Sequence, residues 1–176
     1  MIEVLLALVL GSVAAAPPQP PPEPPVKRHV VETLEKHFDG SMARAGASEP
    51  FEVMGGTVGV YLAGYGAVFT SQVNLIVSPN VSPFRLKMSP EEVSRVHERK
   101  LRQVPVLKQA MRDMLLHSAQ ALDAVPLRQQ IAVGVNLFYF SWEERSGLPS
   151  QLTMHAERGR LLQKPVADNA IVTEEQ

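Results

Sequence analysis

The feature that most constrains the fold is a long amphipathic helical pattern that lies between two segments of alternating polarity. The pattern opens at Ser89-Pro90-Glu91-Glu92, where serine can cap the helix, proline suits the first helical position and Glu92 completes a capping box. On a wheel of about 100° per residue, one stripe collects most of the apolar side chains. Its members are Val93, Val96, Val104, Leu107, Met111, Met114, Leu115 and Leu122. The stripe keeps its phase across Pro105, which predicts one helix bent near that proline, or two collinear helices, over Ser89 to Ala124.

The segments on either side of this helix have the two-residue period of β-strands. In Phe51 to Val77, β-branched and aromatic residues alternate with polar ones, and the glycines of Gly64-Tyr65-Gly66 interrupt the run. We predict a hairpin turn at these glycines, with a glycine bulge as the alternative. Gln130 to Trp142 is apolar on both faces, which is typical of a central strand, and Gln151 to Leu162 contains a partner strand.

Together these patterns predict an α+β fold of two layers. An antiparallel sheet of four to five strands is expected to lie under the one long bent helix. A short N-terminal helix over Val26 to Phe38 is expected to stop at Gly40 and to lead into a loop over Ser41 to Pro50.

The first twenty-five residues give the predicted domain organisation. An apolar run ending in Val13-Ala14-Ala15-Ala16 predicts a signal peptide over residues 1–15. Its start carries Glu3 and no basic residue, which leaves open whether the true start codon lies upstream. The run is too short to span a bilayer, which takes roughly 20 apolar residues. Residues 16–25 form a proline-rich linker, 26–166 a single α+β domain and 167–176 a disordered tail.

Composition excludes several classes of function. The chain has no cysteine, so disulfides, thiol catalysis and cysteine-based metal sites are excluded. The formal net charge is −1, which gives no overall attraction to nucleic acid. Neither a catalytic serine motif nor the i, i+4 histidine pair of a zinc helix is present, so we predict no catalytic residue, no metal and no cofactor.

Three sets of residues are candidate sites, each with a structural alternative. Arg95, Arg99 and Arg102 share one side of the long helix and form either a strip for an anionic partner or a solvated face. His155 and Glu157 share one strand face, where they form either a polar site or an ordinary edge.

Aromatic residues supply the third set. Tyr61 and Tyr65, on or beside the glycine turn, are candidate exposed contacts. Phe138-Tyr139-Phe140 and Trp142 are predicted to be core, with an interface as the alternative.

Two segments also resemble an uncharacterised group of exported bacterial proteins. They are Val60-Tyr61-Leu62-Ala63-Gly64-Tyr65-Gly66-Ala67-Val68-Phe69-Thr70 and Asn136-Leu137-Phe138-Tyr139-Phe140-Ser141-Trp142-Glu143. The group has no assigned activity, so the resemblance implies bacterial export and supplies no catalytic residue.

The sequence therefore predicts a non-catalytic interaction or accessory protein of the bacterial cell envelope, either periplasmic or extracellular. Its expected partner is an envelope protein or an anionic surface, with no nucleic acid and no transmembrane span, and its oligomeric state is left open. The alternatives are a periplasmic hydrolase and a carrier that holds an apolar ligand between helix and sheet. An enzyme requires a concave pocket of titratable groups, a carrier an apolar cavity, and an interaction module an exposed patch.

Overall fold

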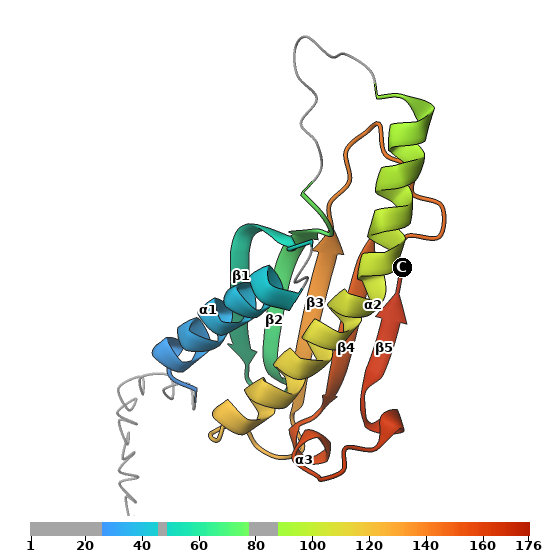
Figure 1. The fold of residues 1–176 in the computed structure, drawn as a ribbon. Coiled ribbons are helices and arrows are strands. Elements are labelled where there is room, and N and C mark those ends of the chain that lie inside the picture. The colour runs from blue at the N-terminus through green and yellow to red at the C-terminus, as the bar shows by residue number, and fades with distance from the viewer. Residues whose placement is uncertain (1–25, 46–48, 78–87) are drawn as a thin grey trace, which may run out of the picture.

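The structure is a computed structural model that describes residues 26–45, 49–77 and 88–176 (Figure 1). The predicted signal peptide and linker lie outside the described residues. The elements follow one another as α1 (Arg28–Ala45), β1 (Glu52–Leu62), β2 (Gly66–Asn74), α2 (Pro90–Ala121), β3 (Gln130–Leu137), β4 (Gln151–Glu157), α3 (Arg158–Leu161), a 3₁₀ turn (Asp168–Ala170) and β5 (Val172–Glu175). None of the described helices combines the length and the apolar character needed to cross a membrane.

The five strands form one sheet in the order β1-β2-β3-β4-β5. The hairpin β1–β2 turns at Gly64 to Gly66, as predicted, and the β3–β4 and β4–β5 pairs are also antiparallel. The β2–β3 pair is parallel, because α2 carries the chain back along the sheet between these strands. The α+β fold is confirmed, and the sheet is mixed at this one pair of strands.

The two long helices lie on the same face of the sheet, α1 over β1 and β2 and α2 across β3 and β4 (Figure 1). Helix α2 is continuous through Pro105, and its N-terminus has the predicted capping box of Ser89 and Glu92. The core lies between the helices and the sheet. Its largest fully buried side chains include Leu34, Phe38, Met42, Phe69, Leu107, Met111, Leu115 and Ile131.

Helix α1 is longer than predicted, because it continues through Gly40 to Ala45. Met42 follows Phe38 by four residues, so it lies one turn further along the same helix face, and both side chains are fully buried. Burying a methionine side chain stabilises the helix by about 1.5–3 kcal/mol, which exceeds the cost of about 1 kcal/mol for a glycine in a helix. The predictions of a stop at Gly40 and of a loop starting at Ser41 are therefore wrong.

The prediction of a disordered tail over residues 167–176 is also wrong, because Val172–Glu175 forms β5 at the edge of the sheet beside β4. All four residues of β5 are exposed, so no apolar alternation marks the strand in the sequence. The strand is held by backbone pairing and by neighbours on either side of it. Ala170 is buried just before β5, and Lys108 Nζ of α2 lies 2.5 Å from Glu175 Oε1.

Helix α1 also occupies the free edge of β1. Glu35 Oε1 accepts a hydrogen bond from the Gly59 amide at 2.6 Å, and Arg28 Nη1 donates to the Gly59 carbonyl at 2.9 Å. Asp39 Oδ1 accepts from the Thr57 amide at 2.9 Å. Side chains of α1 thus make the backbone hydrogen bonds that a sixth strand would make. The helix can approach this closely because Gly59 has no side chain: a Cβ there would lie 2.6 Å from Val31 Cγ1.

A buried ion pair joins α2 to the segment that follows β3. Lys100 is fully buried, its Nζ lies 2.5 Å from Glu143 Oε2, and it donates to the Phe138 carbonyl at 3.2 Å. The same ammonium group lies 4.7 Å from the centre of the Tyr139 ring. Burial lowers the pKa of Lys100 despite the opposing effect of Glu143, and burial raises the pKa of Tyr139 to about 12.

Candidate functional site

The sheet has one face that no described helix covers. Because α1 and α2 lie together on the opposite face (Figure 1), the side chains that alternate away from the core have no described helix above them. On β1 these are Val58, Val60 and Leu62, which are 56%, 45% and 49% exposed. Tyr65, in the turn that follows, is 42% exposed. We call this uncovered surface the open face.

The register of the strands shows that an apolar row crosses the whole open face. Val60 pairs with Val68 on β2, Val68 with Ala132 on β3, Ala132 with His155 on β4, and His155 with Val172 on β5. Four of these five side chains are aliphatic, and His155 is the single polar one. Val60 and Val172 are exposed, Val68 and His155 are partly exposed, and Ala132, between them on β3, is buried. We call this set the central row.

Two further rows flank the central row. On one side lie Val58, Thr70, Gly134, Thr153 and Glu174, and on the other lie Leu62, Gly66, Gln130 and Glu157. The carboxylates stand at the margins of the face, on β4 and β5 and at Glu52, where β1 begins. The area over β1, β2 and β3 between those margins is apolar or uncharged, which is unusual for a solvated sheet face.

An aromatic cluster extends the open face beyond the end of β3. Phe138, Phe140 and Trp142 continue the alternation of Ala132 and Gly134, and each is half-buried. The rings of Phe138 and Phe140 meet edge to face at 5.0 Å, and those of Phe140 and Trp142 stack at 5.8 Å. The cluster is therefore an accessible surface and is not enclosed in the core.

The structure places the predicted site residues in three separate regions. His155 and Glu157 do share one strand face, and that face is the open one; Glu157 also lies 3.7 Å from Arg160. Tyr65 is exposed at the turn, whereas Tyr61 packs against the core and donates to Gln129 Oε1 at 2.9 Å. The tyrosines therefore do not form one contact surface.

The arginine strip is divided between solvent and an ion pair. Arg99 Nε lies 2.6 Å from Glu49 Oε1, so its charge is partly neutralised. Arg95 and Arg102 are exposed, and Arg95 lies in a shallow hollow beside Glu91 and Glu98. An anionic partner along this strip remains a prediction.

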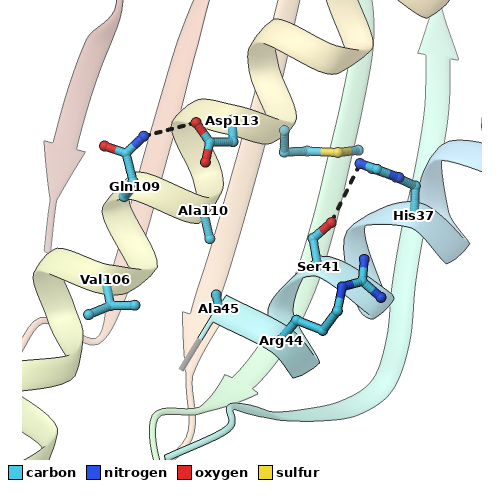
Figure 2. Close-up of a pocket in the computed structure, with 9 residues that line it drawn as sticks. His37, Ser41, Arg44, Ala45, Val106, Gln109, Ala110 and Asp113 are labelled. Atoms are coloured by element: carbon cyan, nitrogen blue, oxygen red, sulfur yellow. Dashed lines mark hydrogen bonds between the residues drawn. The ribbon is translucent and has the colours of Figure 1, made fainter. Parts of the chain in front are cut away.

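On the covered side, a cavity of about 330 Å³ opens between α1 and α2 (Figure 2). Its lining combines apolar side chains, such as Val106 and Met114, with polar groups from both helices. His37, Ser41 and Arg44 come from α1, and Gln109 and Asp113 from α2. Ser41 Oγ lies 3.5 Å from His37 Nε2, and Gln109 Nε2 donates to Asp113 Oδ1 at 2.8 Å.

His37 also stacks on His117 of α2, with the ring centres 4.0 Å apart and the planes 18° from parallel. Burial lowers the pKa of His37, and the nearby His117 and Arg44 lower it further, so a neutral ring is favoured at this contact. Sequence reasoning missed this pair because the two histidines lie far apart in the chain, and no local spacing relates them.

Among the described residues, no group of three or more histidines or carboxylates is placed to hold a metal ion. Comparison with family models, with curated proteins and with solved structures finds no match. The function is therefore inferred from the chemistry of the open face and of the cavity.

Proposed function

We propose that this chain is a non-catalytic interaction module of the bacterial cell envelope and that it binds a partner protein through its open face. The observation that carries this proposal is the exposure of Val58, Val60 and Leu62 on a sheet face without a helix layer. Contiguous exposed apolar side chains, bordered by polar ones, mark interaction sites in soluble proteins.

The energetics favour covering this face. Removing apolar surface from water contributes about 25 cal/mol per Å², so covering several half-exposed aliphatic side chains supplies a few kcal/mol. The backbone of the sheet is already paired, so a partner that covers the face leaves few polar groups unsatisfied. The adjoining rings of Phe138, Phe140 and Trp142 add the residue types that are enriched in the cores of interfaces.

The location in the envelope rests on the sequence. The apolar leader and the proline-rich linker before Val26 support export, with the folded domain held at a distance from its N-terminal end. The resemblance to exported bacterial proteins supports the same location. Fractionation of cells expressing the full chain tests it: the proposal expects a processed form in the periplasm or the medium, and an uncut form confined to the cytoplasm contradicts it.

The interaction itself is tested by photo-crosslinking in cells. A photoreactive amino acid placed at Val60 is expected to give a crosslinked product, because this position lies at the middle of the exposed part of β1. The matched control carries the same group at Leu101, which is 39% exposed on α2. Equal adduct patterns at the two positions, or none at Val60, would count against the open face.

A second candidate function, binding of a small polar ligand, is favoured by the cavity between α1 and α2. Its volume of about 330 Å³ is within the range of ligand sites. Arg44 and Asp113 bring opposite charges to the same cavity, which suits a molecule that carries both an acidic and a basic group. A carrier for apolar ligands is less well supported, because the described helix–sheet interface is filled by side chains such as Phe38 and Leu107.

The cavity is tested by thermal-shift screening of small zwitterions such as free amino acids. Binding should raise the unfolding temperature of the unaltered protein and should be lost in Arg44→Gln and in Asp113→Asn. Arg112→Gln, a change just outside the cavity, is the control and should retain the shift. A shift that survives both cavity substitutions would place the binding elsewhere.

A further inference from the structure

We infer that the partner of the open face is a second copy of this chain, and that two copies stack sheet on sheet about an axis that follows the central row. This inference rests on the proposed function, because it takes the open face to be the binding surface. It is argued from the register of the strands, from the charges at the margins and from the area of the face.

The register makes the face complementary to itself. A twofold axis along the central row, perpendicular to the strands, places each member of that row opposite its own copy: Val60 meets Val60, Val68 meets Val68, and the polar His155 meets His155. The same rotation exchanges the two flanking rows. Val58 then lies over Leu62 of the other copy, and Thr153 over the carboxylate of Glu157. Aliphatic groups therefore meet aliphatic groups, and a hydroxyl that can donate meets a carboxylate that can accept.

The alternative axis, parallel to the strands, gives a poorer match. It would place β1 over β5, and Val58 would then lie over the carboxylate of Glu174. Desolvating a carboxylate against an aliphatic side chain without a partner is unfavourable. The axis along the central row avoids this contact, so the charge pattern selects it.

The area is sufficient for a specific contact. The strands contain 11, 9, 8, 7 and 4 residues. With strands about 4.8 Å apart and about 3.3 Å per residue, each copy presents about 600 Å² of sheet and the pair about 1,200 Å². Specific interfaces bury about 1,200–2,000 Å² of accessible surface in total, so the footprint of two fully overlapped sheets is comparable with the lower end of that range. The aromatic cluster adds to this area.

Engineered cysteines test the axis directly, because the natural chain has none. With the shortest thiol crosslinker, Val60→Cys is expected to form linked dimers, since this position faces its own copy. Val58→Cys and Leu62→Cys should crosslink poorly alone and efficiently when the two proteins are mixed. Leu101→Cys, on the outer side of α2, is the control. Equal crosslinking of Val58→Cys alone and of the mixture would overturn the axis.

Sedimentation of the full mature chain tests the choice of partner. The unaltered protein should be in reversible equilibrium between monomer and dimer, and Leu62→Asp should weaken the dimer about tenfold or more because two charges enter one apolar contact. Leu101→Asp should leave the dimer unchanged. A protein that stays monomeric over the accessible concentrations would overturn this inference; if the photoreactive group at Val60 still captured another protein, the proposed function would stand.

Discussion

Two stacked imidazole rings, His37 and His117, join α1 to α2. The pKa of His37 lies below its ordinary value because of burial and of the neighbouring His117 and Arg44. As the pH falls, the unfolded chain takes up a proton at this residue more readily than the folded protein. The contribution of His37 to the stability of the fold is therefore fully present above the ordinary histidine pKa of about 6.5, and this contribution is lost as the pH falls through the folded value.

We predict that His37→Gln reduces the loss of thermal stability between about pH 7.5 and about pH 5.5, a window that spans the ordinary histidine pKa. Melting temperatures at the two pH values provide the measurement. His29→Gln, an exposed change on the same helix, is the control. If the two variants and the unaltered protein lose the same number of degrees, the stacked pair does not control the response.

The ion pair of Lys100 and Glu143 gives a second prediction at the scale of single residues. Lys100→Met removes the cation and leaves a carboxylate that is 1% exposed at its side chain, so we expect a loss of about 3–5 kcal/mol in the free energy of unfolding. The double variant Lys100→Met with Glu143→Leu should recover most of that loss. Urea unfolding measures both. A double variant no more stable than the single one would contradict the assignment.

Some of these residues were predictable and others were not. Ser89, Pro90 and Glu92 carry a local signal, because a helix cap depends on residues within one turn of each other. Lys100 interrupts the apolar stripe of α2 and carries no such signal. Its burial depends on Glu143 and Phe138, which only the folded chain brings near it.

At the scale of elements, α1 protects the edge of the sheet. Glu35 accepts from the amide of Gly59 and pairs with Arg28 at 2.9 Å, so one carboxylate serves both the strand and the cation. We predict that Glu35→Ala exposes the β1 edge and accelerates hydrogen exchange at the amide of Gly59. The expected loss of stability is about 1–3 kcal/mol, because a backbone donor and a cation lose their acceptor.

Glu32→Ala is the matched control, since Glu32 accepts a hydrogen bond from the same Arg28 on the exposed side of the helix. It should change stability by less than about 0.5 kcal/mol. Exchange at Gly59 that is equally slow in both variants would show that the carboxylate does not protect the edge.

The elements that the sequence predicts well are those with a periodic apolar pattern. The long stripe after Ser89 predicts α2, and alternation predicts β1, β2, β3 and β4. β5 lacks such a pattern, and its pairing with β4 is decided by the tertiary fold. The pair Gly55-Gly56, whose composition is equally typical of a turn, forms a bulge inside β1 with φ values of 79° and 81°. Glycine favours both structures, so composition alone does not separate them.

At the scale of the whole molecule, the residues that stabilise the fold differ from the residues of the proposed binding surface, the open face. The core lies on one side of the sheet and the open face on the other, so replacing Val58 and Val60 by threonine should leave the free energy of unfolding of the monomer within about 1 kcal/mol. Threonine keeps the β-branched shape that suits a strand. Chemical unfolding at low protein concentration provides the measurement, and Val133→Thr, a fully buried change on β3, should cost several times more.

The edge contacts made by α1 have a further consequence for assembly. A sheet with a free edge can add strands without limit, which leads to fibres. Here Glu35, Arg28 and Asp39 bond the β1 edge, and the other edge is a four-residue strand that carries Glu174 and Glu175. Growth by strand addition is thus blocked at one side and discouraged at the other. A face-to-face contact buries the open face of both copies, so association through this surface stops at a dimer.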